Sequence, residues 1–162
     1  DYSSSLNKLY RSGFEIGIHS YNHTDYTTLS RGEILDDIDK CDKALLKVTG
    51  HTTVLVGAPS GAYDDNVVRT IEDSGRYCIQ WSVDGIDYIE TTPQEIAERV
   101  TSELDAGDII LLHNGTEFTK EALPMILDSV KDTYEFVTVS DLIYKDGYRI
   151  DYAGKQWRNT MR

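Results

Sequence analysis

Cysteine is nearly absent from this sequence of 162 residues, and the two that occur stand in different kinds of segment. Cys41 lies in a charged stretch with helical periodicity, whereas Cys78 lies in an apolar, strand-like one. A disulfide framework needs more cysteines than this, so we interpret both as free thiols. A scaffold held together by disulfides is thereby excluded, and the redox compartment stays open.

Basic residues are also few, because 16 lysines and arginines stand against 28 aspartates and glutamates, for a formal net charge of −12. Such a charge repels the phosphate backbone of nucleic acids and the surface of an anionic membrane, so both are disfavoured as partners. The longest aliphatic run is Ile109–Leu112. It is far shorter than the roughly 20 residues that cross a bilayer, and we expect no transmembrane segment.

The sequence has only three prolines, and it contains no internal repeat and no linker rich in proline or glycine. We therefore expect one principal domain over residues 1–150, followed by a C-terminal tail over residues 151–162.

The chain begins Asp1-Tyr2-Ser3, without an initiator methionine or a basic and apolar leader. We expect this to be a processed, cleaved or engineered N-terminus rather than a start of translation.

Apolar, strand-like segments alternate with segments of helical periodicity along the chain. Strands are expected over residues 14–18, 53–56, 77–83, 109–112 and 136–139, and helices over 3–12, 30–49, 65–74, 92–104, 119–131 and from 140 onward. Ser30 and Glu33 form a capping-box pattern at the start of one helix. This alternation predicts an α/β domain with a parallel sheet, open or barrel-like, whose functional residues lie at the carboxyl ends of the strands.

Histidines follow two of these strands. His19 and His23 come after the first, and two imidazoles four residues apart can bind a divalent metal ion such as zinc; the alternative is an ordinary surface or core position. His113 ends the run 109–112, where an imidazole is either a satisfied core residue or a working acid or base. His51 lies before its strand, and we assign it no role.

A tight loop and two carboxylates follow two further strands. Residues 57–63 read GAPSGAY and can aim backbone N–H groups at a ligand, although a rigid strand-to-helix turn explains them as well. Asp84 and Asp87 lie three residues apart, and in an acidic chain they could simply be exposed loop residues. Because the carboxyl ends of parallel strands share one rim, we expect all four features to lie on the same side of the sheet.

In this order the motifs resemble those of the polysaccharide deacetylases of carbohydrate esterase family 4, the NodB-homology domain. The similar segments are GFEIGIHSYNH at 13–23 (family GHEIGNHTxxH), APSGAYD at 58–64 (RPPYGxxN), DGIDY at 84–88 (DxxDW), DIILLH at 108–113 (LxH) and FVTVSDL at 136–142. The PSG form of the loop is similar to the sporulation-associated bacterial branch of the family.

The resemblance implies a distorted (β/α) barrel, lacking its first strands in this chain, with a groove for a glycan. It implies hydrolysis of acetyl groups from a sugar with the help of a divalent metal, zinc in first place, held by His19 and His23. His113 would be the general acid, and Asp87 would hold its imidazole. The backbone N–H of Ser60 would stabilise the oxyanion. The remaining substrate-binding residues would be Pro59, Gly61, Tyr88 and Leu111.

The sequence also departs from the family pattern. The first motif, TFDDG, is missing, and with it the aspartates that serve as general base and third metal ligand. Asp25 or Asp84 could stand in for one of them. Gly57 occupies the place of the usual arginine, which orients the base. A second chain could cover the sheet edge that the missing strands would leave exposed.

We therefore expect a metal-dependent hydrolase that removes acetyl groups from an N-acetylated polysaccharide, either peptidoglycan or a chitin-like glycan. The alternative is a catalytically impaired pseudo-deacetylase that binds glycan without turnover. Amide hydrolysis on a substrate other than a sugar ranks last. The substrate class implies an extracellular or cell-envelope location.

Overall fold

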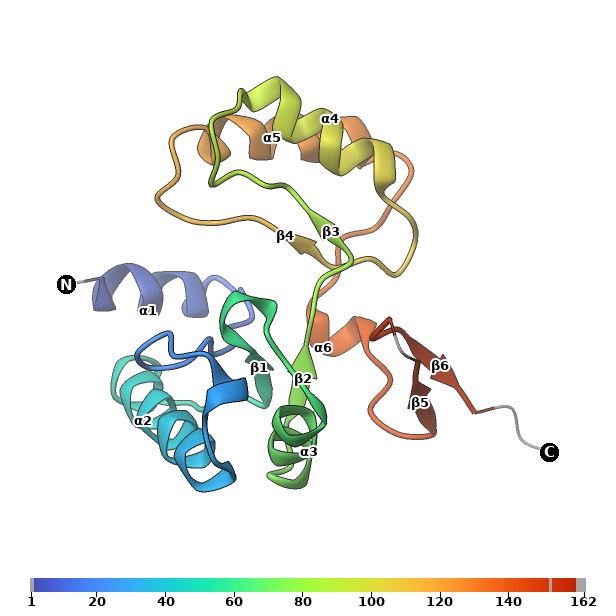
Figure 1. The fold of residues 1–162 in the computed structure, drawn as a ribbon. Coiled ribbons are helices and arrows are strands. Elements are labelled where there is room, and N and C mark those ends of the chain that lie inside the picture. Colours follow the sequence, from blue (N-terminus) through green and yellow to red (C-terminus); the bar gives the residue numbers. More distant parts are fainter. Residues whose placement is uncertain (1, 152, 160–162) are drawn as a thin grey trace. The chain divides into compact units, whose positions relative to one another are not determined.

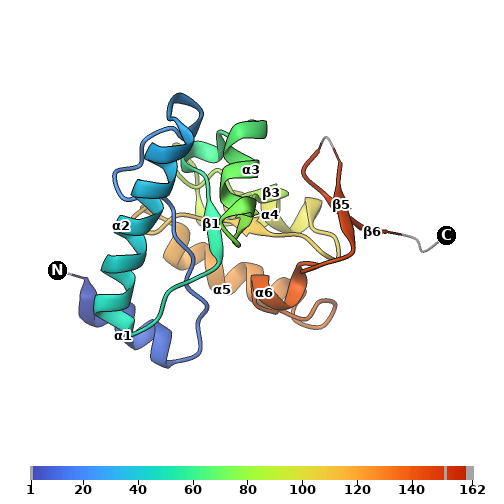
Figure 2. The ribbon, with the colours of Figure 1, turned by 90° about the horizontal axis from the view of Figure 1, so that it is seen from below.

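The computed structural model describes residues 2–151 and 153–159. The chain divides into two compact units, Asp1–Gln80 and Trp81–Arg162, and each is described by itself (Figures 1 and 2). The first unit contains α1 (Ser3–Arg11), η1 (Tyr26–Thr28), α2 (Arg31–Thr49), β1 (Leu55–Gly57), η2 (Pro59–Gly61), α3 (Asp65–Asp73) and β2 (Tyr77–Ile79). The alternation of helices with short parallel strands confirms the expected α/β class for this unit.

The sheet of the first unit is short. Strands β1 and β2 pair in parallel, with Val56 opposite Cys78. The expected strand over 14–18 is reduced to a single parallel bridge between Ile18 and Val56. Strand β1 therefore lies between β2 and the chain segment that leads into His19.

Local sequence signals explain the longest helix of this unit. Ser30 accepts a hydrogen bond from the Glu33 N–H, and the Glu33 side chain accepts one from the Ser30 N–H, so the predicted capping box is confirmed. The helix ends at Gly50, whose φ of 81° suits glycine. The apolar face of α2 packs into a core with the following members: Ile18, Tyr26, Ile34, Ile38, Cys41, Leu45, Val56, Ala58, Val67 and Ile71.

The second unit contains β3 (Val83–Asp84), α4 (Pro93–Glu103), β4 (Ile110–Leu111), α5 (Thr119–Val130), α6 (Val139–Leu142), β5 (Tyr148–Ile150) and β6 (Gln156–Arg158). Strands β3 and β4 pair in parallel, and helices α4 and α5 lie side by side (Figure 1). Their shared core consists of Val83, Ile96, Ala97, Val100, Ala122 and Ile126. This core anchors the two strands from which the second set of predicted site residues emerges.

Three further expectations about secondary structure are wrong. The strand expected over 77–83 is two strands, β2 and β3, separated at Gln80–Ser82 and belonging to different units. Residues 136–138 form no strand, since Phe136 and Val137 are half exposed and no strand of the described chain pairs with them. Helix α6 begins at Val139, one residue before the expected start at residue 140.

Residues near the C-terminus form an antiparallel hairpin of β5 and β6, in which Arg149 lies opposite Trp157. The hairpin crosses the boundary expected at residue 150, and the division into a domain and a tail stays a prediction. In the part of the chain described, the strands form three two-stranded sheets and no closed barrel, so barrel closure also stays a prediction. A second chain that covers the exposed sheet edge likewise stays a prediction.

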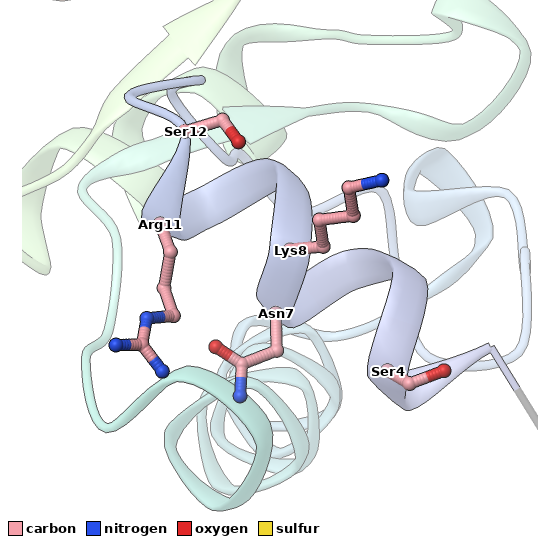
Figure 3. Close-up of a pocket in the computed structure, with 5 residues that line it drawn as sticks. All are labelled: Ser4, Asn7, Lys8, Arg11 and Ser12. Atoms are coloured by element: carbon pink, nitrogen blue, oxygen red, sulfur yellow. The ribbon is translucent and has the colours of Figure 1, made fainter.

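Cys41 and Cys78 are both free thiols, as expected. Within residues 2–151 and 153–159, no helix combines the length and the apolar character needed to cross a membrane. A surface pocket lies along α1 and is lined by Ser4, Asn7, Lys8, Arg11 and Ser12 (Figure 3). None of the predicted site residues lines this pocket.

Candidate active site

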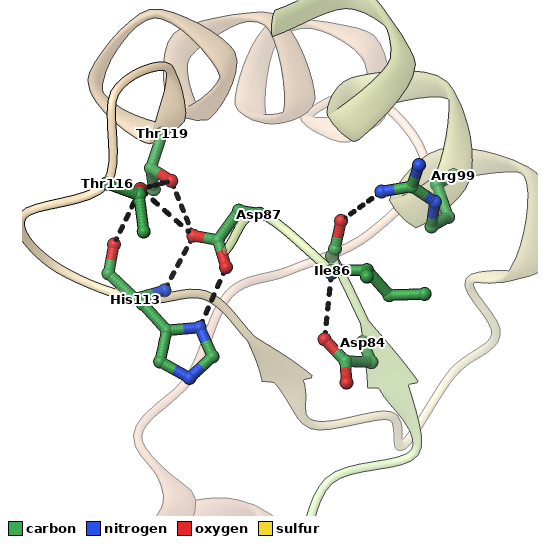
Figure 4. A network of polar contacts seen from close by, with 8 residues as sticks. Asp84, Ile86, Asp87, Arg99, His113, Thr116 and Thr119 are labelled. Carbon is green, nitrogen blue, oxygen red and sulfur yellow. Dashed lines mark hydrogen bonds and ion pairs between the residues drawn. The ribbon is translucent and has the colours of Figure 1, made fainter. Parts of the chain in front are cut away.

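Asp87 and His113 form a hydrogen-bonded pair in the second unit (Figure 4). They follow the paired strands β3 and β4, whose register sets Asp84 opposite Leu111. Asp87 Oδ1 lies 2.7 Å from His113 Nδ1, and Asp87 Oδ2 accepts the backbone N–H of His113 at 2.7 Å. The parallel pairing thus brings together two side chains that lie 26 residues apart in sequence.

Asp87 is an anion in a buried position, only 3% exposed. Burial by itself raises the pKa of Asp87, but hydrogen bonds from the Thr119 hydroxyl and from the amide and ring of His113 outweigh it and hold that pKa below its usual value. Because an ionised carboxylate only accepts hydrogen bonds, Nδ1 of His113 is the donor. Nε2 is then the ring nitrogen left for a ligand, on a side chain that is 42% exposed.

Thr119 was missed by the sequence analysis. It is the first residue of α5, and its hydroxyl donates to Asp87 Oδ2. The Thr116 hydroxyl is hydrogen-bonded to that of Thr119, which extends the network (Figure 4). A threonine at the start of a helix is usually read as a local capping residue, and no periodic pattern could have revealed a long-range bond to Asp87.

The turn that carries Asp87 is strained and tightly held. Ile86 has a φ of 47°, which a β-branched residue rarely adopts. Its N–H donates to Asp84 Oδ1 at 2.8 Å, and the Arg99 guanidinium donates to the Gly85 carbonyl (Figure 4). Asp84 is therefore a structural residue of this turn. Such strain persists only where neighbouring contacts hold it, and here these two hydrogen bonds fix the turn that carries Asp87.

The two predicted wall residues of the acetyl pocket lie in the same unit. The Tyr88 ring meets that of His113 edge-on, with centroids 5.2 Å apart, and Tyr88 is 59% exposed. Leu111 lies in β4, two residues before His113. An exposed aromatic ring beside the imidazole fits a binding surface, while the acetyl-pocket role of both residues stays a prediction.

His19 and His23 lie close together in the first unit, with ring centroids 5.0 Å apart and planes at 69°. His19 Nδ1 donates to the Gly57 carbonyl oxygen at 3.1 Å, the kind of contact that commonly fixes the ring of a metal-binding histidine. A Cβ at position 57 would lie 3.3 Å from His19 Nδ1, so glycine there lets the imidazole lie against the strand. The pair fits two ligands of a divalent metal site.

A third ligand is not found in the described chain, which contains no group of three His, Cys, Asp or Glu side chains placed to hold a metal ion. Asp25 instead caps η1, where its Oδ1 accepts from the N–H and the hydroxyl of Thr27. Asp25 and Asp84, the two expected stand-ins, thus both have structural roles in the fold.

The loop after β1 forms the tight turn η2. Pro59 is buried, Ser60 has a φ of 56°, and Gly61 N–H donates to the Ala58 carbonyl at 3.1 Å. Ser60 thus occupies a conformation that favours glycine. The oxyanion role of its N–H, and the contacts of Pro59 and Gly61 with substrate, stay predictions.

The structure therefore contains two groups of predicted site residues. His19, His23 and the loop 59–61 belong to the first unit, whereas Asp87, Tyr88, Leu111 and His113 belong to the second.

Comparisons with known proteins identify the family of the chain. Residues 1–79 match the family model described as polysaccharide deacetylase. An uncharacterised protein of Bacillus subtilis, YlxY, is 32% identical over 137 residues, which are 84% of this chain and 43% of that protein. The peptidoglycan-N-acetylglucosamine deacetylase PgdA of Listeria monocytogenes is 32% identical over 146 residues, 90% of this chain and 30% of that one. The chain spans less than half the length of either relative.

Among solved structures, a CE4 family pseudoenzyme from Bacillus anthracis superposes with a TM-score of 0.81 at 30% identity, covering 89% of this chain and 51% of the other. The similarity thus extends over most of this chain in both sequence and fold. The chain therefore belongs to the polysaccharide deacetylase family, carbohydrate esterase family 4.

Proposed function

We propose that this chain supplies the general acid and two metal ligands of a deacetylase acting on an N-acetylated polysaccharide, either peptidoglycan or a chitin-like glycan. The observation that carries the proposal is the Asp87–His113 pair. A buried carboxylate on Nδ1 fixes the orientation of the ring and leaves Nε2 as the nitrogen that can give a proton to a substrate. Family membership supports the reaction class.

The chemistry assigned to these residues is proton transfer during amide hydrolysis. The oxygen of water bonds to the acetyl carbon while a carboxylate base, the role of an aspartate in the family's first motif, takes one of its protons. The C–N bond then breaks, and the sugar amine leaves with an added proton. We assign that proton to Nε2 of His113, while Asp87 stabilises the imidazolium and fixes the ring. Tyr88 and Leu111, which lie in the same unit as His113, would form the wall beside the acetyl group.

We assign a divalent metal ion, zinc in first place, to His19 and His23. The hydrogen bond from His19 Nδ1 to the Gly57 carbonyl supports this assignment, because metal-binding histidines commonly donate their other ring N–H to such an acceptor. When bound, the metal would polarise the acetyl carbonyl and lower the pKa of a bound water. The contribution of this chain is to hold two imidazoles close together.

A second candidate is a pseudo-deacetylase that binds glycan without turnover. Two observations favour it: Gly57 stands where the family has an arginine, and the described residues offer only two grouped ligands. The similar Bacillus anthracis protein is itself a pseudoenzyme, and a mutant of it with restored enzymatic activity superposes with the same TM-score of 0.81. This fold thus accommodates both outcomes.

One experiment separates the two candidates. The chain is incubated with Zn²⁺ and either N-acetylglucosamine oligomers or purified peptidoglycan, and released acetate is measured beside sedimentation of the protein with insoluble glycan. Turnover that disappears in His113→Ala, and persists in His51→Asn, supports the deacetylase. Glycan binding without acetate supports the pseudo-deacetylase. Neither binding nor acetate would overturn both.

The proposed substrate class also implies a place of action. Glycans of this kind lie outside the cytoplasmic membrane, and several matched relatives are named as peptidoglycan deacetylases. We infer an extracellular or cell-envelope location for the protein that contains this chain.

A further inference from the structure

Asp37 is a buried carboxylate on α2, only 6% exposed, and it contacts the loop that carries the two histidines. Its Oδ1 accepts two hydrogen bonds, from the Tyr26 hydroxyl at 2.7 Å and from the Tyr21 backbone N–H at 2.9 Å. Tyr21 stands midway between His19 and His23 in sequence. The helix is therefore tied directly to the middle of the histidine loop.

The loop itself has an unusual backbone. Ser20 has a φ of 67° and His23 a φ of 56°, so two residues other than glycine adopt left-handed conformations on either side of Tyr21. Residues in such conformations persist only where surrounding contacts hold them. The bond from Tyr21 to Asp37 is a contact of this kind, because it fixes the peptide that lies between the strained positions.

Asp37 contacts its neighbours as a hydrogen-bond acceptor. In the part of the chain that is described, no lysine, arginine or histidine forms an ion pair with it. Tyr26 is fully buried, and its pKa is raised by burial first and by Asp37 second, so the phenol stays a donor. Burying a carboxyl group without an ion-pair partner lowers the stability of the fold, and an apolar side chain of similar size would lower it less.

We propose that Asp37 is a positioning residue that holds His19 and His23 in the arrangement needed to share one divalent cation. This inference rests on the metal-binding role proposed above. Asp37 acts through the Tyr21 peptide rather than by touching the cation. Sequence reasoning does not single it out, because it stands among the acidic residues Asp36 and Asp39 and resembles part of a solvated helix face.

The probe that tests this is Cu²⁺–iminodiacetate, a chelate whose open coordination positions can take two imidazoles at once. The affinity of the whole chain for it is measured by titration, with His19→Ala and His23→Ala giving the level for a broken pair. We expect Asp37→Ala to lose about 10–100-fold in affinity, the usual effect of removing a partner that orients metal ligands. Asp36→Ala is the matched control, an exposed carboxylate on the same helix that should leave the affinity unchanged.

Tyr26→Phe separates positioning from simple stability. This variant removes one hydrogen bond to Asp37 but keeps the bond from Tyr21, so it should lower the Tm yet retain the chelate affinity. Asp37→Ala should lower both. Affinity that follows Tm across the variants, or Asp37→Ala binding as tightly as the parent chain, would overturn the inference.

The result of this titration can be told apart from the result of the acetate assay that tests the proposed function. The chelate needs only two imidazoles and no turnover, so tight binding can be observed even where no acetate is released. A parent chain that binds no more tightly than His19→Ala would instead show that the pair is not held for one cation. That result would refute the role of Asp37 whatever the outcome of the acetate assay.

Discussion

His113 receives two contacts from a single buried carboxylate: Asp87 Oδ1 lies 2.7 Å from its Nδ1, and Asp87 Oδ2 accepts its backbone N–H at 2.7 Å. The ring and the main chain of His113 are thus oriented by the same group. This double contact leads to the first prediction.

Asp87→Asn should lower the turnover number by about 10²–10⁴-fold, the range expected when a general acid loses its proper protonation. The amide can donate to Nδ1, which would favour the wrong tautomer and remove the charge that stabilises the imidazolium. Acetate release at several pH values, at saturating glycan, measures the effect. Glu90→Gln, at an exposed position of the same loop, is the control. Unchanged turnover in Asp87→Asn would exclude His113 as the acid.

Stability should depend on the ionisation of Asp87 at low pH. The pKa of this carboxyl is lowered in the folded chain, so its contribution is fully present above the unfolded value of about 3.8 and is lost as the pH falls through the lower folded value. Urea unfolding between pH 2 and 6 should show a steeper acid loss for the parent chain than for Asp87→Asn. Parallel curves for the two proteins would contradict the assignment.

Thr119→Val should destabilise the second unit by about 1–3 kcal/mol, because the buried carboxylate loses a donor while the side-chain shape is kept. The same change should raise the pKa of Asp87, since that hydrogen bond lowers it. Chemical denaturation measures the free energy of unfolding. Thr133→Val, at an exposed position, should change it by less than about 0.5 kcal/mol.

Gly85→Ala should disturb the turn before Asp87. A Cβ there would lie 2.5 Å from Leu112 Cδ2 and 3.2 Å from the Leu111 carbonyl oxygen, so the Leu112 side chain must move and the Leu111 carbonyl must yield slightly. We expect a loss of about 1–3 kcal/mol, as in other overpacked sites. Gly32→Ala in α2 meets no atom within 4 Å and should stabilise the chain by up to about 1 kcal/mol. A neutral Gly85→Ala would show that the strand pair is looser than described.

Metal content should depend on the histidine pair. The parent chain and the double variant His19→Ala/His23→Ala are purified identically and subjected to elemental analysis. Zinc near one equivalent in the parent, lost in the double variant, is the expected result, because the rings of His19 and His23 lie 5.0 Å apart and can share one ion. Absence of metal from both proteins would favour the glycan-binding alternative.

Much of the first unit was determined by local sequence. The capping box at Ser30 and Glu33 defined the start of α2, and Gly50 defined its end, because both signals act through neighbouring backbone groups. The spacing of His19 and His23 likewise predicted a pair of nearby imidazoles. The family resemblance implied that Asp87 holds the imidazole of His113, and the two side chains are hydrogen-bonded in the structure, while their catalytic roles stay predictions.

Only the tertiary structure decided the contacts between distant segments. Thr119 and Arg99 contact the turn that carries Asp87 across 32 and 14 positions of the sequence. In the first unit, Asp37 contacts the histidine loop across 16 positions. Such bonds depend on how strands and helices pack, which no local pattern encodes. The same reason explains why the apolar residues 136–138 form no strand: a strand needs a partner, and whether one lies alongside is a property of the folded chain.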